Sequence, residues 1–268
     1  LDIEKIDLIA NFAAIHREPG HDNNEYYETN LPGAENVCDF ATRTNCKNII
    51  FTSSISPYGP CEDVKDENTI PTPETAYGGS KLAAEKIHRI WKEQSNENNL
   101  IIARPGVIFG PGEGGNVTRL IKAVTNRYFL YMGNKETRKA GIYIKELCLA
   151  LGWGMQKISS NNNLILMNLT MNPGPSIYEY VQEICNVNKI KRNIFSVPFS
   201  LILFSSIIIE FLLRPFGVKH PFNPVRIKKL VRSNNIHPGF LVENNYQYKY
   251  SLHDAMSDWK RECPEDWK

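Results

Sequence analysis

The chain contains 268 residues, of which 42% are hydrophobic and 22% charged, and its formal net charge is +2. This length can bury the core of one large domain or two small ones, and the globular composition excludes disordered and fibrous proteins. The charge is too small to indicate a nucleic-acid partner, and the spacing of the six cysteines gives no indication of a metal site. No signal peptide is recognisable, so we expect a cytoplasmic protein with reduced thiols.

The first informative segment, residues 8–14, is apolar enough to form a strand that is buried on both faces of a sheet. His16 follows this strand closely. Ligands of open α/β sheets bind at the carboxyl ends of the strands, so His16 is a candidate substrate-binding residue, with an ordinary surface histidine as the alternative. No glycine-rich phosphate-binding turn precedes the strand, and we therefore expect the chain to begin within a fold.

A helix is predicted next, because apolar residues recur at helical spacing at Tyr27, Leu31, Ala34, Val37 and Ala41. Pro32 lies inside this pattern. A proline in a helix removes one N–H donor, so we expect a kink near Asn30.

Residues 48–52 read as a buried strand that ends in Ser53 and Ser54. Residues 60–73, rich in acids and prolines, are predicted to form a loop at the rim of a site.

The following helix has a candidate reactive face, because Tyr77 and Lys81 are four residues apart and therefore share one side of it. A lysine ammonium beside a tyrosine hydroxyl favours the phenolate, which makes tyrosine a usable general acid and base. The apolar stripe that packs this helix is predicted to consist of Ala83, Ile87, Ile90 and Trp91. The same Tyr-x-x-x-Lys spacing recurs from Tyr131 to Lys135, but Gly133-Asn134 predicts a turn there and favours the first copy.

A third buried strand covers residues 100–103 and leads into Arg104-Pro105-Gly106, where proline ends the strand and glycine allows close approach of a ligand. Asn116 then begins a helix, either as its N-cap or as a substrate contact. The basic pair Arg138-Lys139 precedes three further predicted elements: a helix over 144–156, a strand over 164–169 and a helix over 176–187.

Residues 199–213 are the most apolar segment, yet they are shorter than the about 20 residues that span a bilayer. Basic residues flank the segment on both sides. Two interpretations remain open, a buried helix of a substrate lobe and a helix that rests on an anionic membrane surface.

Together these motifs resemble the extended short-chain dehydrogenase/reductases, in the form of NAD-dependent sugar epimerases and dehydratases. The motifs are the strand ending in Ser53-Ser54, the Tyr77-x-x-x-Lys81 helix and the run from Arg104 to Gly112. The resemblance implies an α/β fold with a doubly wound parallel sheet, Rossmann-like and N-terminally truncated, and a smaller C-terminal substrate lobe. It implies a dinucleotide-binding domain over residues 1–110, to which residues 143–170 return, and a substrate lobe over residues 111–268.

The resemblance also implies roles for single residues. Tyr77 takes the proton of a sugar C4 hydroxyl while hydride passes to NAD, Lys81 holds the ribose, and Ser54 hydrogen-bonds the substrate oxygen. Asn30 matches an asparagine that supports the catalytic lysine through water. The implied cofactor-binding residues are Phe12, Ala13, Ala14, Asn30, Ser53, Tyr77, Lys81 and Pro105. The expected substrate-binding residues are His16, Ser54, Asn116, Arg138 and Lys139, the last two for a diphosphate.

The implied reaction is NAD-dependent C4 epimerisation of a diphosphate-linked hexose or N-acetylhexosamine in surface polysaccharide synthesis. Ile55-Ser56-Pro57 stands where sugar dehydratases carry an Asp-Glu pair, which disfavours dehydration. Residues 13–17 and 134–144 are similar to epimerases that act on undecaprenyl-diphosphate-linked N-acetylhexosamine. This similarity favours a polyprenyl-linked substrate and a peripheral position on the inner membrane face through residues 199–213, and a homodimer is a further expectation.

Two alternatives stay open on the sequence alone. A membrane-associated hydroxysteroid-type dehydrogenase shares the triad and the apolar C-terminal part. A catalytically inactive remnant that binds partners is the second alternative, because the family's glycine-rich unit, on the order of 60 residues, does not occur in this sequence.

We expect the 268-residue chain to bind NAD weakly, because the glycine-rich turn and helix N-terminus that receive a pyrophosphate do not occur in it. Titration of the purified chain with NAD measures the affinity, and a micromolar or tighter Kd would contradict this expectation. Enzymatic activity is to be measured on a variant that we call the extended chain, in which the glycine-rich βα segment of a related epimerase is joined ahead of Leu1.

Overall fold

The computed structural model describes residues 5–17, 20–159, 162–213 and 232–268, and in the helix that ends at residue 213 it describes side chains up to residue 209. The chain divides into two compact units. Unit 1 comprises Leu1–Ile108, Ala140–Pro173 and Ile236–Tyr248, and unit 2 comprises Phe109–Lys139, Gly174–Asn235 and Lys249–Lys268.

Unit 1 is built on a parallel four-stranded sheet with the strand order β1-β2-β4-β8. Its strands are β1 (Ile9–Asn11), β2 (Asn48–Thr52), β4 (Asn99–Pro105) and β8 (Leu164–Leu169). The register aligns Ala10 with Ile50, and Ile50 with Ile101. Because all four strands are parallel, their carboxyl ends meet at one edge of the sheet.

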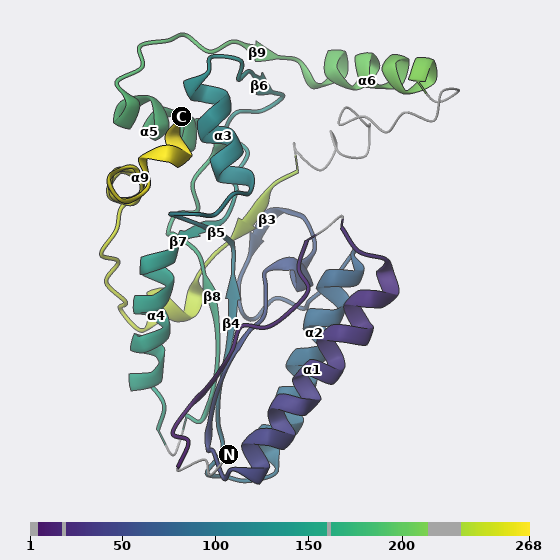
Figure 1. The fold of residues 1–268 in the computed structure, drawn as a ribbon, viewed down its shortest axis with the longest axis vertical. Helices are drawn as coiled ribbons and strands as arrows, with labels where there is room; N and C mark the ends of the chain where they lie inside the picture. The colour runs from purple at the N-terminus through teal and green to yellow at the C-terminus, as the bar shows by residue number, and fades with distance from the viewer. Residues whose placement is uncertain (1–4, 18–19, 160–161, 214–231) are drawn as a thin grey trace. The chain divides into compact units, whose positions relative to one another are not determined.

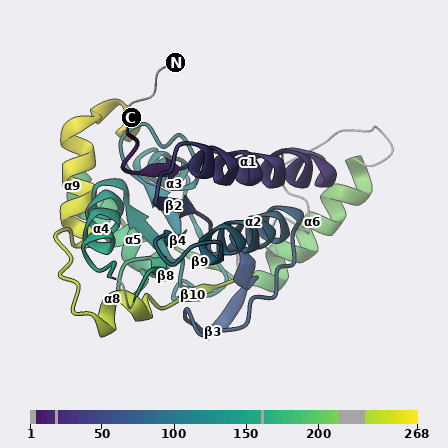
Figure 2. The same cartoon turned by 90° about the horizontal axis from the view of Figure 1, so that it is seen from below.

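Helices cover both faces of this sheet (Figures 1 and 2). Helices α1 (Asn23–Arg43) and α2 (Ala76–Glu93) lie side by side on one face, and α4 (Ile144–Gln156) covers the other. Side chains alternate along a strand, so Ile49 and Phe51 join the core under α1 and α2, whereas Ile50 joins the core under α4. This layered parallel sheet confirms the predicted α/β class.

The structure corrects the first strand. β1 contains only three residues, Ala10 is exposed, and Leu8 is 40% exposed, so the segment is not buried on both faces. The reason is its place at the edge of the described sheet, beside β2 alone.

Helix α1 continues through Pro32. Its buried stripe is shifted by one position from the predicted one at its start and consists of Tyr26, Asn30, Ala34, Cys38 and Ala41. Tyr27 instead is 40% exposed.

The buried face of α2 differs from the predicted apolar stripe. Ile90 is 62% exposed and Ala83 and Ile87 are only partly buried, although Trp91 is buried as expected. The residues that face the core are Gly78, Ser80, Lys81, Ala84, Glu85, His88 and Trp91. Three ionisable side chains are thus buried on this helix.

The predicted loop over residues 60–73 also needs correction, because it contains the strand β3 (Cys61–Lys65). The Lys65 carbonyl accepts a hydrogen bond of 2.8 Å from the His237 amide, so backbone pairing holds this segment. The other short elements are η1 (Ser56–Tyr58), β5 (Val107–Phe109), β7 (Gly141–Tyr143), β10 (Asn234–Ile236) and α8 (Gly239–Glu243).

Unit 2 is mainly helical, with α3 (Asn116–Thr125), α5 (Ile177–Asn188), α9 (Leu252–Glu262) and η3 (Pro264–Trp267). Phe109 packs against Tyr180 of α5 and Trp259 of α9, at ring distances of 5.9 and 6.3 Å. Ser176 caps the start of α5 through reciprocal hydrogen bonds with Glu179.

A second part of unit 2 consists of the paired strands β6 (Tyr131–Met132) and β9 (Ser196–Val197), followed by α6 (Phe199–Leu213). In the described residues, no helix has both the length and the apolar character that crossing a membrane requires.

Candidate active site

The candidate catalytic residues of unit 1 come from the carboxyl edge of the sheet and the start of α2. Ser53 and Ser54 follow β2 directly, and Tyr77 lies in the first turn of α2, one turn before Lys81. The helix begins here because the Thr75 hydroxyl accepts the Gly78 amide at 3.1 Å, which satisfies an N-terminal donor.

Close packing brings this first turn against the loop of residues 53–56, which we call the serine loop. A Cβ at Gly78 would lie 2.7 Å from the Ser56 carbonyl oxygen, so only glycine fits without a shift. The Ser54 hydroxyl accepts the Ser56 amide at 3.1 Å and lies 3.1 Å from the Ser56 hydroxyl. The Tyr77 side chain is half-buried.

Lys81 is a buried cation, with only 3% of its surface exposed. Its ammonium lies 4.5 Å from the centroid of the Phe51 ring, a cation–π contact that offsets part of the lost hydration. Burial lowers the pKa of Lys81 to about 8, against the opposing charge of Glu85. At pH 7 the side chain is therefore still mainly protonated, as a partner for a tyrosine phenolate must be.

Asn30 links α1 to the turn after β1 and to α2. Its Oδ1 accepts the Ile15 amide at 3.0 Å, and its Nδ2 donates to the Ser80 hydroxyl at 3.0 Å. The structure thus places Asn30 against the residue that precedes Lys81. Its expected role toward the lysine stays a prediction.

The expected cofactor-binding residues of β1 lie in an open turn. Phe12 is 58% exposed and Ala13 is exposed, while Ala14 is partly buried. The Asn11 carboxamide holds this turn by accepting the Ala13 amide at 3.2 Å. His16 follows as an exposed residue, and Pro105 ends β4 as a buried one.

A buried ionic network, which sequence reasoning missed, lies under the serine loop. The Glu85 carboxylate accepts hydrogen bonds from the Ser53 hydroxyl at 2.5 Å and from the Arg104 guanidinium at 2.8 and 2.6 Å. Arg104 in turn lies over the Tyr58 ring, 4.6 Å from its centroid, and the Tyr58 hydroxyl donates to Asn168 at 3.0 Å. The only signal in the sequence was the position of Glu85, one turn after Lys81.

The remaining expected substrate residues belong to unit 2. Asn116 is exposed and accepts from Arg119 at 2.8 Å; the N-cap is Gly115, and the nearby Glu113 carboxylate accepts the Thr118 amide at 2.9 Å. Arg138 donates to the Gly174 carbonyl and lies 3.8 Å from the Glu179 carboxylate. Lys139 donates to the Arg232 carbonyl.

The second Tyr-x-x-x-Lys copy is not on a helix. Tyr131 lies in β6, and Gly133 has a φ of +72°, which confirms the predicted turn. Lys135 instead lies over the Tyr178 ring at 4.3 Å. Only the copy at Tyr77 therefore sets tyrosine and lysine on one helical face.

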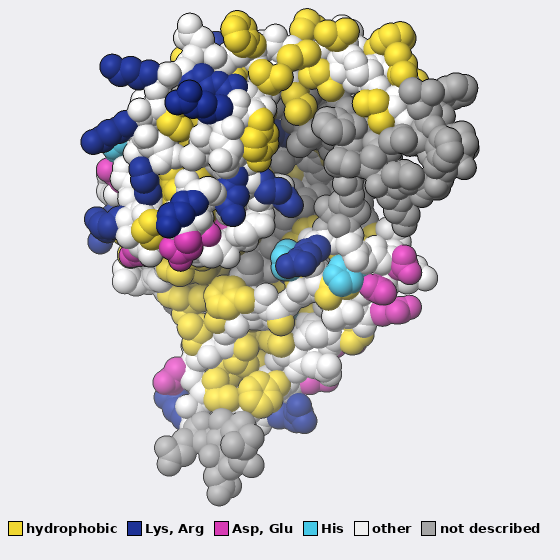
Figure 3. All heavy atoms as spheres, turned by 45° about the horizontal axis from the view of Figure 1, so that its top comes forward, with side chains coloured by type: hydrophobic (Ala, Val, Ile, Leu, Met, Phe, Trp, Pro, Cys, Tyr) yellow, Lys and Arg dark blue, Asp and Glu magenta, His cyan; other side chains and the backbone are white. Residues whose placement is uncertain are grey.

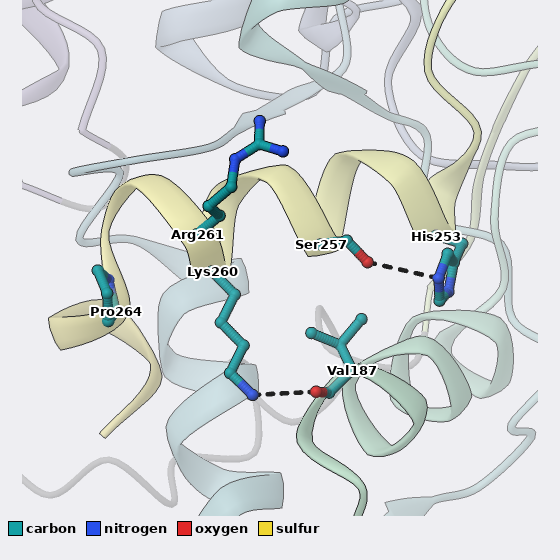
Figure 4. Close-up of a pocket in the computed structure, with 6 residues that line it drawn as sticks. All are labelled: Val187, His253, Ser257, Lys260, Arg261 and Pro264. Atoms are coloured by element: carbon teal, nitrogen blue, oxygen red, sulfur yellow. Dashed lines mark hydrogen bonds between the residues drawn. The ribbon is translucent and has the colours of Figure 1, made fainter.

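A shallow depression of unit 2 is lined by Val187, His253, Ser257, Lys260, Arg261 and Pro264 (Figure 4). His253 binds Glu183 at 2.8 Å and lies 3.4 Å from the Ser257 hydroxyl, while Lys260 donates to the Val187 carbonyl at 2.9 Å. Glu183, His253 and Ser257 are connected in the same sequence as the acid, histidine and serine of a hydrolytic triad, but the contact between His253 and the Ser257 hydroxyl is long. These contacts link α5 to α9 and account for the polar lining.

Replacement of Lys81 by methionine should raise the free energy of unfolding at pH 7 by about 1–3 kcal/mol. The fall in the lysine pKa from 10.5 to about 8 corresponds to about 3 kcal/mol, and the lost cation–π contact reduces the gain. The native state carries the full desolvation penalty below pH 8 and is relieved of it as the pH rises toward 10.5. Denaturant titrations should show a smaller gain in the free energy of unfolding at pH 10 than at pH 7.

Lys86→Met is the matched control, because Lys86 is exposed on the same helix. Its stability should change little at either pH. An Lys81→Met chain that is less stable than the unmodified chain at pH 7 would contradict the assigned burial of a charged ammonium.

Comparison with known proteins places this chain in a family. The model of the NAD dependent epimerase/dehydratase family matches residues 1–169. The chain is 27% identical over 251 residues to the N-acetyl-alpha-D-glucosaminyl-diphospho-ditrans,octacis-undecaprenol 4-epimerase of Escherichia coli O157:H7, covering 93% of this chain and 75% of that protein. It is 32% identical over 123 residues to the UDP-glucose 4-epimerase of Vibrio cholerae, covering 44% of this chain and only 36% of that enzyme.

Solved structures show the same fold. The UDP-N-acetylglucosamine 4-epimerase from Bacillus cereus matches with a TM-score of 0.73 and 18% identity, over 97% of this chain and 80% of that one. The UDP-glucuronic acid 4-epimerase from Bacillus cereus in complex with NAD matches with a TM-score of 0.72 and 16% identity, over 98% and 76%. With the family match over more than half of its length, the chain belongs to the NAD dependent epimerase/dehydratase family.

Proposed function

We propose that this chain carries the catalytic face of an NAD-dependent sugar 4-epimerase that acts on a diphosphate-linked hexose or N-acetylhexosamine. The observation that carries the proposal is the buried Lys81 one helical turn from Tyr77, with the loop that follows Ser53-Ser54 packed against the start of the same helix. A tyrosine beside such a cation can take and return a proton near neutral pH, as epimerisation of a carbinol centre requires.

Each side chain has one role in this proposal. Tyr77 removes the proton from the sugar C4 hydroxyl and later returns it. Lys81 stabilises the phenolate and binds the ribose of the cofactor, and Ser54 hydrogen-bonds the C4 oxygen. When bound, NAD supplies a hydride acceptor that becomes the donor for the opposite face of the sugar, so the reaction has no net redox change.

The residues at the sheet edge fit a dinucleotide. Ala13 and Ala14 give an open strand end of small side chains, to which a flat cofactor can come close, and the exposed Phe12 offers an apolar surface beside it. We assign cofactor binding to these residues, together with Asn30, Ser53, Tyr77, Lys81 and Pro105. The dinucleotide-binding domain over 1–110 and 143–170 and the substrate lobe over 111–268 belong to the same proposal.

For the substrate we propose His16, Asn116, Arg138 and Lys139, in addition to Ser54. Arg138 and Lys139 each donate to a backbone carbonyl in unit 2. A diphosphate would have to replace these carbonyls as acceptor, and an anionic oxygen is the stronger partner for a guanidinium or ammonium.

We further propose that the sugar is linked to a polyprenyl diphosphate, as in the name of the Escherichia coli relative that covers 93% of this chain. A polyprenyl chain stays in the bilayer, so the enzyme must reach its substrate at the membrane surface. This requires an apolar, cation-flanked surface on the protein.

Unit 2 has such a surface along α6 and at Phe195, which directly precedes β9. Its exposed large hydrophobic side chains are Phe195, Leu201, Phe204, Ile207 and Ile208, which are 43–74% exposed. Figure 3 shows hydrophobic side chains gathered on the upper part of the face in view, with Lys and Arg side chains nearby. Lys189, Lys191 and Arg192 precede the segment, and the basic residues from Arg214 to Lys229 that follow it lie outside the described residues. Each cation near an anionic surface adds about 1 kcal/mol of attraction.

In the extended chain, Tyr77→Phe should lower the rate of epimerisation by about 10²–10⁴-fold, because it removes the hydroxyl that transfers the proton. Tyr131→Phe is the matched control, since it alters the other Tyr-x-x-x-Lys copy, and it should keep most of the activity. Rates are measured as interconversion of the C4 epimers. Loss of activity in Tyr131→Phe with normal rates in Tyr77→Phe would show that the wrong motif was chosen.

The double variant Phe204→Asp/Ile207→Asp should release the extended chain from anionic liposomes and slow turnover of a polyprenyl-linked sugar. Charged side chains on the exposed face of α6 cannot enter the apolar boundary of the bilayer. Cosedimentation measures binding.

The control double variant Val64→Asp/Ile70→Asp alters two exposed apolar residues of unit 1, which are 64% and 79% exposed, and should bind as before. The lipid-linked substrate would be refuted if the extended chain without substitutions did not bind anionic liposomes. It would also be refuted if UDP-N-acetylglucosamine were turned over faster than the lipid-linked sugar.

A further inference from the structure

The network around Glu85 joins two buried, oppositely charged side chains of unit 1. Glu85 is 1% exposed and Arg104 is 2% exposed, and they form a two-point ion pair through Nε and a terminal guanidinium nitrogen. Removal of one partner from a buried pair is strongly destabilising, because the other charge is then left without compensation. The pair therefore holds α2 and β4 in one relative position.

The same carboxylate also binds the serine loop. Glu85 Oε1 accepts the Ser53 hydroxyl at 2.5 Å, while the Ser53 amide donates to the Ala103 carbonyl of β4 at 2.7 Å. Ser53 is thus fixed from two sides, by α2 and by the neighbouring strand. Because Ser54 is the next residue in the chain, the position of its backbone is restricted as well.

The charge of Glu85 acts on Lys81 as well. The two residues are one helical turn apart on the buried face of α2, and the carboxylate opposes the loss of the lysine proton that burial favours. The other titratable groups near the ammonium on this helix are Tyr77 and His88, and the nearby β4 contributes Arg104, which is bound to Glu85. Phe51 of β2 is uncharged. Glu85 is the negative group of this set.

We propose that Glu85 is a positioning residue of the active site, which fixes the serine loop and the Tyr77-Lys81 face of α2 in one geometry. The inference rests on the proposed function, and it assigns to Glu85 no contact with substrate or cofactor. Arg104 is its structural partner, and Tyr58 and Asn168 extend the same network to β8.

The test is Glu85→Gln, which keeps the shape of the side chain and removes its charge. In the isotopically labelled 268-residue chain, the Lys81 ammonium should titrate near pH 8 by NMR, and Glu85→Gln should move this titration to lower pH. The amide signals of Ser53 and Ser54 should shift in the same variant. In the extended chain, kcat should fall by roughly 10²-fold with little change in KM, because misplaced groups impair the reaction more than binding.

Glu146→Gln is the matched control for removal of a buried carboxylate. Glu146 is also 1% exposed, but it belongs to α4 and accepts from Tyr246 at 2.5 Å. This variant should lose stability without any change in the Lys81 titration. A structural role alone for Glu85 predicts the same result for Glu85→Gln, and that result would overturn the proposal.

Glu85→Asp keeps the test decisive if Glu85→Gln fails to fold. Aspartate retains the charge but is one methylene shorter, so Lys81 should titrate near pH 8 while the link to Ser53 is lost and kcat falls. Full kcat in Glu85→Asp would overturn the positioning role. If the unmodified extended chain does not epimerise any sugar, the proposed function fails, whereas the Lys81 titration still decides whether Glu85 controls the lysine.

Discussion

The burial of three ionisable side chains along α2 is the constraint on which the rest of unit 1 depends. Lys81, Glu85 and His88 are each at most 3% exposed, and burial of an unpaired charge costs several kcal/mol. Each is compensated differently: Lys81 by the Phe51 ring, Glu85 by Arg104 and Ser53, and His88 by staying neutral, because burial lowers its pKa to about 4. A rotation or slide of α2 would separate Lys81 from the Phe51 ring and Glu85 from Arg104 and Ser53, so the helix that presents Tyr77 has one stable position on the sheet.

Sequence reasoning predicted the scaffold well and the buried face of α2 poorly, for one physical reason. The strands β2, β4 and β8 are continuous apolar runs, and such runs identify buried parallel strands without knowledge of their partners. On α2 the apolar pattern predicted that Ile90 is buried, because charged residues are expected at the surface, but Ile90 is exposed. What makes Glu85 a core residue is Arg104, which is 19 residues away in the chain, on the strand β4.

The expected phosphate-binding residues show a related limit. Arg138 and Lys139 are expected to bind a diphosphate, but in the structure their side chains donate to the carbonyls of Gly174 and Arg232, which are distant in sequence. Long flexible side chains can bind any acceptor that the fold brings near, and a local sequence motif does not determine which acceptor that is. The same applies to the start of α3, where the Glu113 carboxylate binds helix amides and Asn116 is left on the surface.

The lowered pKa of Lys81 connects the stability of unit 1 with its proposed chemistry. A solvated lysine would be fully charged at pH 7, but its ammonium would be screened by water and would affect a neighbouring phenolate weakly. Burial strengthens this interaction and at the same time brings the lysine close to deprotonation, which a carboxylate one turn away opposes. The destabilising charge of Lys81, the Glu85 carboxylate and the serine loop bound to that carboxylate therefore form one unit.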